Sequence, residues 1–511
     1  MGRFSIQLGV VCAVAASACT NGMTIDVPED AGVVLAVDAG SPDAAVMVMP
    51  GEDAGSPPDA GLATDAAAPA DAALPDAAVT PEDAGIPADA AMPDPYVPAR
   101  YHPGALRSPV TRYVADTLRE IAARNTTAPD DVFMKVGASG TVSQRLLFCF
   151  AGAAQPQYAV NLDGRDALLP TIEHFRGGNA AGTTPFDRVT LAAEGGRSAV
   201  WAISGNPSPV AQEIAAIQPH FAFVNYGTND MGLGSTYQTA LWPFFDNLTA
   251  LLDQLLAAGI VPVVSGLNPR SDLAGAVRWV PTYDAVTRGI AEARQLPYIS
   301  MYLASRDLPA MGLLSDGIHG NVYTVSGNNQ PCVFTPEALS YNYNVRNLLS
   351  LQALDEVRQV VVDAAPSLQA NTDVHQGDGS PGNPFVVDRL PFTHHADTRE
   401  SAHDSNNAYP ACDSGQDESG PEYHYVLTLE AQTRVRAMVF DPASVDVDLH
   451  LLDATGTAAG CVDRNDRIVQ GPLSAGVHRW VVDSFVSGGT ARAGAYLLVL
   501  VECAAGDAAC D

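Results

Sequence analysis

The chain has 511 residues, and its 27 basic residues against 58 acidic residues give a formal net charge of −31 at pH 7. This length predicts more than one domain. So strong an acidic excess argues against nucleic acid or an anionic membrane surface as a partner.

The N-terminus has the pattern of an export signal. Arg3 supplies a short basic region, an apolar run extends from Phe4 to Ala16, and small residues follow. The run is too short to span a membrane. We predict a signal peptide over residues 1–18, cleaved either at an ordinary Ala-x-Ala site or at a lipobox that leaves Cys19 lipidated.

The number of cysteines favours lipidation. Apart from Cys12 in the apolar run, the chain contains Cys19, Cys149, Cys332, Cys412, Cys461, Cys503 and Cys510. Lipidation of Cys19 leaves six cysteines that can pair in an oxidising compartment. We therefore expect a lipid anchor in the cell envelope, at the outer membrane or cell surface, with plain secretion as the alternative.

Residues 19–98 consist mainly of Asp, Ala, Gly and Pro, with repeated Asp-Ala-Gly and Asp-Ala-Ala triplets. Such a segment cannot bury enough apolar surface to offset the entropy of ordering it. We predict a disordered, self-repelling linker. A calcium-binding repeat is the alternative, but the triplets lack the glycine spacing of such loops.

Residues 99–366 alternate apolar runs with segments of helical period. We predict strands over residues 131–136, 188–192, 221–225, 260–264 and 298–301, and helices over 140–150, 239–258, 283–294 and 336–362. This alternation indicates an α/β domain with a parallel sheet that is covered on both faces. Ligands of such sheets bind at the carboxyl ends of the strands.

Residues 367–379 are predicted to be a linker, and residues 380–511 a second, all-β domain with a sandwich or jelly-roll fold. Short strands are expected over residues 423–429, 435–440, 445–452, 478–483 and 495–501. The alternation of polar and apolar residues over 446–451 predicts a sheet with one solvent-exposed face.

One group of residues in this second domain resembles a metal site. His394, His395, Asp397 and His403 are close in sequence but match no metal-binding motif. We interpret them as part of a solvated loop, and we expect neither a metal nor another cofactor.

Three residues of the α/β domain carry the parts of a nucleophilic catalyst. Ser139 follows a predicted strand in a glycine-rich turn, and Asp316 precedes His319 by three residues. A carboxylate on one tight loop with a histidine can hold the imidazole tautomer that accepts the proton of a serine. Gly317 allows that loop to turn.

Asn229 adds a fourth part. It lies in the turn Gly227-Thr-Asn-Asp230 after the most apolar predicted strand, and its side-chain amide is a donor of the kind that stabilises an oxyanion. Each of these residues alone is more often an ordinary turn or surface residue.

Together the motifs resemble the four blocks of the SGNH or GDSL hydrolases over residues 105–365. The blocks are residues 137–141, 195–198, 227–230 and 316–319, in the family's order. The resemblance implies a flavodoxin-like three-layer α/β/α fold. It also implies that Ser139 is the nucleophile, that His319 is the base with Asp316 as its partner, and that Ser139, Gly196 and Asn229 form the oxyanion hole.

The chain departs from the family pattern at two places. Ala138 occupies a position where the family usually has aspartate, and Gly195 competes with Gly196 for one role. An α/β-hydrolase is the nearest rival, but Thr141 occupies the last glycine position of the nucleophile elbow.

The C-terminal region resembles bacterial pre-peptidase C-terminal modules, over residues 380–503. The resemblance is carried by the segments 383–385, 390–392, 423–429, 446–451, 475–483 and 494–499. It implies an accessory β-sandwich. Proximity favours pairing Cys412 with Cys461 and Cys503 with Cys510, which leaves Cys149 for Cys332, although six cysteines allow about 15 pairings.

The sequence therefore predicts a monomeric serine esterase or deacylase of the cell envelope. Its expected substrate is a lipid ester, an acetylated glycan or a small acyl ester, and its only expected contact with a membrane is through the anchor. The alternatives are an acyltransferase and a surface-anchored binding lipoprotein that has lost activity.

Overall fold

The computed structural model describes residues 95–412 and 415–511. The predicted signal peptide, the lipidation site at Cys19 and nearly all of the 19–98 linker lie outside the described residues. Within the described ranges, no helix is both long and apolar enough to cross a membrane.

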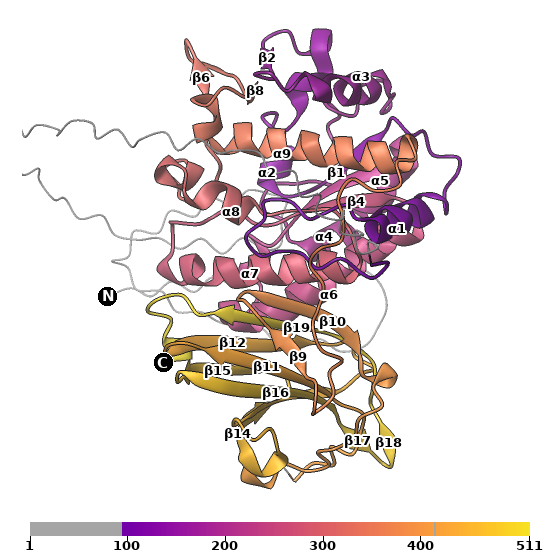
Figure 1. The fold of residues 1–511 in the computed structure, drawn as a ribbon. Helices are drawn as coiled ribbons and strands as arrows, with labels where there is room; N and C mark the ends of the chain where they lie inside the picture. The colour runs from indigo at the N-terminus through magenta and orange to yellow at the C-terminus, as the bar shows by residue number, and fades with distance from the viewer. Residues whose placement is uncertain (1–94, 413–414) are drawn as a thin grey trace, which may run out of the picture. The chain divides into compact units, whose positions relative to one another are not determined.

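A four-stranded parallel sheet forms the centre of the N-terminal described region (Figure 1). Its strand order is β1-β3-β4-β5, with bounds β1 Phe133–Gly137, β3 Phe221–Asn225, β4 Val261–Ser265 and β5 Tyr298–Ile299. Nearly all of these positions are buried, as expected for apolar strands between two layers of helices. The carboxyl ends of the strands therefore meet at one edge.

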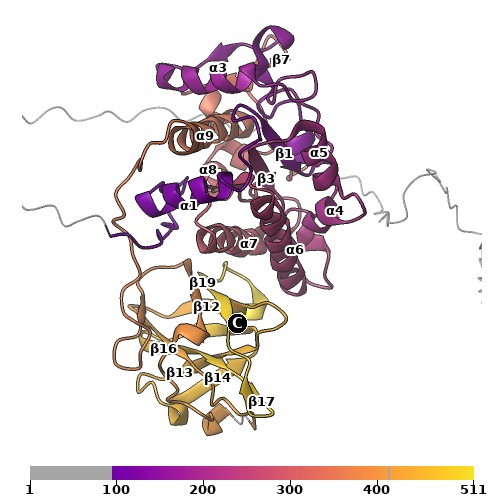
Figure 2. The ribbon, with the colours of Figure 1, turned by 90° about the vertical axis from the view of Figure 1, so that its right-hand side faces the viewer.

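Helices cover both faces of this sheet. Helix α9 lies on one face and α6 and α7 lie on the other, in two perpendicular views (Figures 1 and 2). The helices are α1 Arg112–Ala122, α2 Ser139–Val142, α3 Leu169–Gly177, α4 Ala199–Ile203, α5 Pro209–Ile217, α6 Tyr237–Ala257, α7 Ala274–Ala293, α8 Met301–Arg306 and α9 Asn342–Val357. A capping box between Thr236 and Thr239 starts α6.

The strand predicted over residues 188–192 is wrong. Side chains take the backbone groups that a neighbouring strand would need: Glu213 accepts from Leu191 N at 3.0 Å, and the Thr190 hydroxyl accepts from Ala192 N at 3.0 Å. Only an isolated bridge between Gly137 and Ala193 remains. Backbone N–H groups in this segment therefore donate to polar side chains instead of to a neighbouring strand.

The helix predicted over residues 140–150 is also wrong as a continuous element. It is divided into α2 and a 3-10 helix at Phe148–Ala154. Between them, Asn347 of α9 accepts from Leu147 N at 2.9 Å and donates to Arg145 O at 2.8 Å. A distant asparagine therefore satisfies backbone groups that a helix would have paired internally.

The C-terminal strands form two sheets that enclose one hydrophobic core. One sheet has the order β10-β19-β12-β15 and is antiparallel; the other has the order β14-β13-β16-β11-β9, in which only β9 and β11 pair in parallel. Their bounds are β9 Phe385–Val387, β10 Phe392–Asp397, β11 Tyr423–Leu429, β12 Thr433–Phe440, β13 Val447–Leu452, β14 Cys461–Asn465, β15 Ile468–Leu473, β16 Gly476–Ser484 and β19 Ala495–Glu502.

Two predictions for this region are wrong. Strand β13 has no exposed face, because its outer positions are buried as fully as its inner ones; the ring of Tyr409 covers His450 at a centroid distance of 3.6 Å. Residues 392–397 form strand β10 rather than a solvated loop, and His394 is buried with Nδ1 3.0 Å from the Tyr425 hydroxyl.

The described part of the chain contains three disulfides: Cys149–Cys332, Cys412–Cys461 and Cys503–Cys510. They are the pairings that proximity favoured. The first joins segments 183 residues apart, which holds the region after α2 against the chain that follows the His319 loop.

Lys135 of β1 is the only lysine in the chain and is fully buried. Its Nζ donates to Phe186 O at 2.9 Å and lies 4.2 Å from the centroid of the Phe148 ring. Burial lowers the pKa of this amine from its usual value to about 7. The folded chain therefore releases a proton near pH 7 that the unfolded chain keeps to about pH 10.4.

Because the unfolded state holds more protons between these values, this group makes stability rise with pH from about 7 to 10. We expect the melting temperature of the wild type to approach or overtake that of Lys135→Met as pH increases from 6 to 10. Thermal unfolding followed by circular dichroism measures this. Curves that stay parallel across the range would contradict the buried, titrating lysine.

Candidate active site

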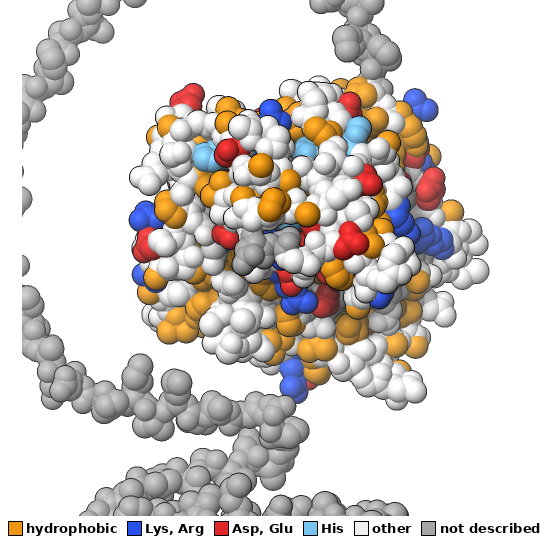
Figure 3. All heavy atoms as spheres, turned by 90° about the horizontal axis from the view of Figure 1, so that it is seen from below, with side chains coloured by type: hydrophobic (Ala, Val, Ile, Leu, Met, Phe, Trp, Pro, Cys, Tyr) orange, Lys and Arg blue, Asp and Glu red, His pale blue; other side chains and the backbone are white. Residues whose placement is uncertain are grey.

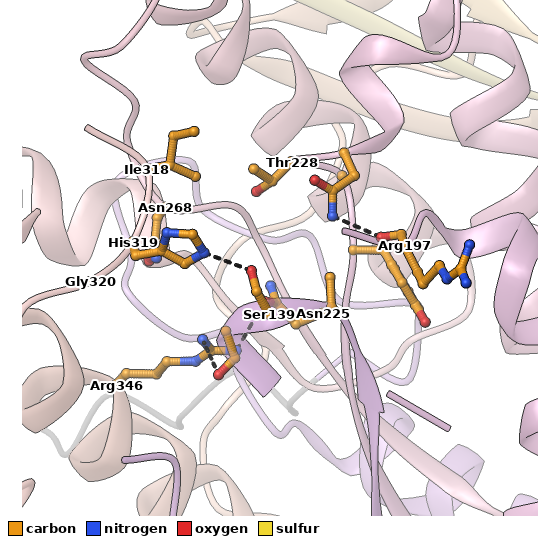
Figure 4. Close-up of a pocket in the computed structure, with 14 residues that line it drawn as sticks. Ser139, Arg197, Asn225, Thr228, Asn268, Ile318, His319, Gly320 and Arg346 are labelled. Carbon is orange, nitrogen blue, oxygen red and sulfur yellow. Dashed lines mark hydrogen bonds between the residues drawn. The ribbon is translucent and has the colours of Figure 1, made fainter. Parts of the chain in front are cut away.

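Ser139 lies at the first position of α2, directly beyond the carboxyl end of β1. The chain is crowded here, because a Cβ added to Gly137 would lie 2.2 Å from Thr141 Oγ1 and 2.7 Å from Asn225 O. Only glycine therefore allows β1 to turn so sharply into α2. The serine hydroxyl points away from the sheet into a pocket (Figure 4).

His319 reaches the same pocket from a loop between α8 and α9, and Asp316 lies on that loop beside it. His319 Nε2 lies 2.9 Å from Ser139 Oγ, and His319 Nδ1 lies 2.8 Å from Asp316 Oδ2 (Figure 4 shows the first contact). When the Nδ1–H group donates to the carboxylate, Nε2 carries no proton and is free to accept the serine proton. Ser139, His319 and Asp316 thus form one continuous hydrogen-bonded chain.

The loop itself fixes the carboxylate. Asp316 Oδ1 accepts from the amides of Ile318 and His319, both at 2.9 Å. These amides and the imidazole lower the pKa of Asp316 to about 2, so the carboxylate is charged at all ordinary pH values. Gly317 has φ +69°, and a Cβ there would lie 2.7 Å from Asp272 N.

Asn229 lines the same pocket, and the two candidate glycines, Gly195 and Gly196, lie in the segment before α4. The Asn229 amide donates one hydrogen to Arg197 O at 2.8 Å and has a second hydrogen available. Gly195 is the glycine beside the serine, since a Cβ there would lie 3.9 Å from the Ser139 Cβ. A Cβ at Gly196 would meet no atom within 4 Å.

Sequence reasoning missed Asp230, which holds two of the motif segments together. Its carboxylate is fully buried and accepts from Ala199 N at 2.8 Å and Gly227 N at 2.9 Å. Burial raises its pKa to about 6 despite these donors. Asp230 thereby ties the start of α4 to the turn that carries Asn229.

Arg346 and Asn225 were also missed. Arg346, in α9, is 5% exposed, and its guanidinium donates to Asn225 Oδ1 at 2.9 Å and to Gly140 O at 3.4 Å. Asn225 in turn donates to Ser265 O and Gly266 O, at 3.1 and 2.9 Å. This network supports the floor beneath Ser139. Its only signal in the sequence is an arginine inside a buried helix.

The pocket is lined mainly by polar groups. Besides the residues above, its lining includes Thr228, Asn268 and Gly320. The His319 and Asp316 side chains are 42% and 46% exposed, so the reacting groups lie at a rim rather than in a deep channel. Among the described residues, the side chains spaced to hold a metal ion lie in the C-terminal region, at Glu418 before β11, His450 of β13 and Asp483 of β16.

Residues 177–323 match the model of the GDSL-like Lipase/Acylhydrolase family. The match contains Asn229, Asp316 and His319 and begins after Ser139. No curated protein sequence matches the chain.

The chain is also similar to several solved structures. They include a GDSL-like lipase from Bacteroides thetaiotaomicron, with 14% identity over 47% of this chain and 98% of the other at a TM-score of 0.28. Esterase EstA from Pseudoalteromonas sp. has 16% identity over 37% and 88%, at 0.25. A two-domain esterase active on acetylated mannans has 12% identity over 76% and 95%, at 0.25.

The family match places a GDSL-like lipase/acylhydrolase domain in this part of the chain, on a fold with a parallel sheet and flanking helices. Enzymes of this class are hydrolases that act on esters.

Asp230 gives a test of how the site is positioned. In Asp230→Asn, the side-chain amide can accept one hydrogen bond, but its NH₂ group opposes the second backbone N–H. We expect a loss of about 1–3 kcal/mol of stability and a fall in kcat of about 10 to 100-fold with little change in KM.

Ester hydrolysis and thermal unfolding measure these effects. Asp307→Asn is the matched control, since that carboxylate is 85% exposed and its pair with Arg306 contributes little. An Asp230→Asn enzyme with unchanged kcat would show that Asp230 does not position the site.

Proposed function

We propose that this protein is a serine esterase or deacylase that hydrolyses carboxylic esters through an acyl-Ser139 intermediate. The observation that carries the proposal is the chain of contacts from Ser139 Oγ to His319 Nε2 and from His319 Nδ1 to Asp316, at 2.9 and 2.8 Å. The GDSL-like family match over residues 177–323 supports the same reaction class.

In the first half-reaction, Ser139 Oγ attacks the acyl carbon while His319 Nε2 takes the hydroxyl proton. Asp316 stays ionised and stabilises the imidazolium, because its pKa of about 2 prevents it from taking the proton itself. His319 then protonates the departing alkoxide, and the alcohol leaves. In the second half-reaction, His319 takes a proton from water as the water oxygen attacks the acyl-serine. His319 then returns this proton to Ser139 Oγ as the bond to the acyl carbon breaks, which releases the carboxylic acid and restores the enzyme.

The negative oxygen of each tetrahedral intermediate needs donors. Asn229 is the proposed side-chain donor, with the backbone amides of Ser139 and Gly196, and Gly195 is the adjacent alternative for the third. The free hydrogen of the Asn229 amide and its place in the pocket support this role. Such a preorganised donor is worth about 100 to 1000-fold in rate.

The pocket favours a short acyl group on a polar alcohol. Its lining is rich in amide, hydroxyl and guanidinium groups, and no long apolar channel leads from Ser139 among the lining residues. Of the three substrate classes, an acetylated glycan or a small acyl ester therefore fits better than a long-chain lipid ester.

The activity test compares the purified wild type with Ser139→Ala on p-nitrophenyl acetate and octanoate. We expect kcat/KM to be at least about 10-fold higher for the acetate, and Ser139→Ala to lose about 10⁴-fold or more in kcat. A fluorophosphonate should label the wild type at Ser139 alone. Residual hydrolysis in Ser139→Ala at the wild-type rate would refute the mechanism.

Asn229→Ala is the companion variant, because it leaves the three hydrogen-bonded residues in place. It should keep fluorophosphonate labelling but lose about 100-fold in kcat. Transfer of the acetyl group to an added alcohol in preference to water would instead identify an acyltransferase. Absence of both hydrolysis and labelling would favour the binding protein that Ala138 suggests.

We further propose that the enzyme acts in the cell envelope, anchored through a lipid on Cys19. Three disulfides among the six remaining cysteines are consistent with an oxidising compartment. Mass spectrometry of the native N-terminus tests the anchor. An unmodified Cys19, or a mature chain that begins after it, would contradict lipidation while leaving the esterase proposal untouched.

A further inference from the structure

The C-terminal strands contain a second group of chemically active side chains, far from Ser139 in sequence and on a different sheet. Four carboxylates are gathered on the outer side of β13 and β16 and in the segment before β11, and all are 0–2% exposed: Glu418, Glu422, Asp448 and Asp483. On the face shown in Figure 3, by contrast, acidic and basic side chains are scattered among apolar ones. Burying so many like charges is costly without cations.

The strand register places two of these carboxylates directly opposite each other. Asp448 of β13 and Asp483 of β16 are direct cross-strand partners. Like charges at opposed positions of an antiparallel pair destabilise a sheet. Two cations reach the four carboxylates in ion pairs between described residues: His424 lies 2.9 Å from Glu422, and Arg464 lies 3.0 Å from Asp448 and 3.6 Å from Glu418. With all four carboxylates ionised and both cations charged, two negative charges would remain without a partner.

His450 is the residue that points to a ligand. It is fully buried, and neither ring nitrogen has a hydrogen-bond partner among the described residues. Its ring stacks on Tyr409 with an interplanar angle of 12°, a contact that uses the ring face and leaves both nitrogens free in the ring plane. Buried imidazole nitrogens are normally satisfied, so an imidazole with none satisfied calls for an explanation.

Glu418 is in the same state. It is fully buried, and neither of its carboxylate oxygens accepts a hydrogen bond among the described residues. One ligand atom each of Glu418, His450 and Asp483 lies within 4.8 Å of the other two. Ligand atoms about 2.1 Å from a tetrahedral zinc ion lie about 3.4 Å apart, so side-chain rotations that bring these three atoms closer by up to about 1.4 Å would close the set on an ion.

We propose that Glu418, His450 and Asp483 bind one divalent transition-metal ion, best matched by zinc. An imidazole nitrogen with two carboxylate oxygens is a zinc-type ligand set, whereas calcium takes oxygen ligands only. A dication would also balance the two remaining negative charges of four ionised carboxylates. Tyr409 donates to Asp483 Oδ2 at 2.8 Å, and this bond orients one ligand from outside the metal shell.

The ion would fasten a long connection to the sheet. Between β10 and β11 the chain forms only two short 3-10 turns, at Thr398–Glu400 and Pro410–Cys412, among its described residues. The Cys412–Cys461 disulfide holds one point of this connection to β14. Glu418 would hold a second point to β13 and β16 through the metal. The site is therefore structural, and it is independent of the Ser139 pocket.

The test uses the full chain, produced without a histidine tag and dialysed against zinc. We expect about one zinc per chain by elemental analysis, and a melting temperature at least about 5 °C lower after EDTA that zinc restores. His450→Gln and Glu418→Gln should each lower zinc affinity at least about 10-fold. His394→Gln, which alters a buried histidine of β10 in the other C-terminal sheet, should leave the zinc affinity unchanged.

Zinc-edge X-ray absorption on the wild type does not depend on whether a variant folds. It should show one imidazole nitrogen, carboxylate oxygens and no sulfur. No stoichiometric zinc, equal zinc affinity in all four chains, or stabilisation by calcium but not zinc would overturn the proposal.

Discussion

The parallel register of β1 with β3 is the constraint on which the catalytic geometry depends. Gly137 pairs with Asn225, so the two strands end together. Ser139 follows one strand by two residues, and Asn229 follows the other by four. With both ends fixed by backbone hydrogen bonds, the nucleophile and the amide face one pocket without depending on long flexible side chains. Hydrogen bonds to Asp230 and from Arg346 then fix the turns that follow these strands, which the sheet itself does not hold.

The C-terminal strands share the core of the hydrolase domain. Leu497 and Val499 of β19 belong to the same hydrophobic cluster as the residues of α6 and α7. Arg436 of β12 is fully buried, with its guanidinium 3.7 Å from the centroid of the Trp279 ring and 3.2 Å from Thr282 Oγ1. Buried apolar contacts and a desolvated arginine are costly to separate. These strands therefore act as part of the hydrolase scaffold, on the side of the helices rather than at the Ser139 pocket.

Much of this could be predicted from the sequence. The apolar runs predicted β1, β3 and β4 to within a residue or two, because a strand that is buried on both faces appears in the sequence as a continuous apolar run. The grouping of Ser139, Asp316 and His319 could be predicted because each lies in a short motif with its own turn glycine. The role of Arg346 could not be predicted, since one arginine within a buried helix has no partner visible in the sequence. The errors at residues 140–150 and 188–192 share a cause. In both segments, backbone groups form hydrogen bonds with side chains, those of Asn347, Glu213 and Thr190, and no local sequence pattern predicts these bonds.

Other buried carboxylates of the described chain accept hydrogen bonds from nearby donors. Glu213 is fully buried, yet Arg188 donates to both its oxygens at 3.1 and 3.0 Å and Leu191 N adds a third bond. Asp284 accepts from the hydroxyls of Tyr298 and Ser300, at 2.7 and 2.9 Å. Glu418 is as deeply buried and accepts nothing. Since this fold supplies donors to its other buried acids, the lack of donors at Glu418 and His450 is best explained by a cation that takes their place.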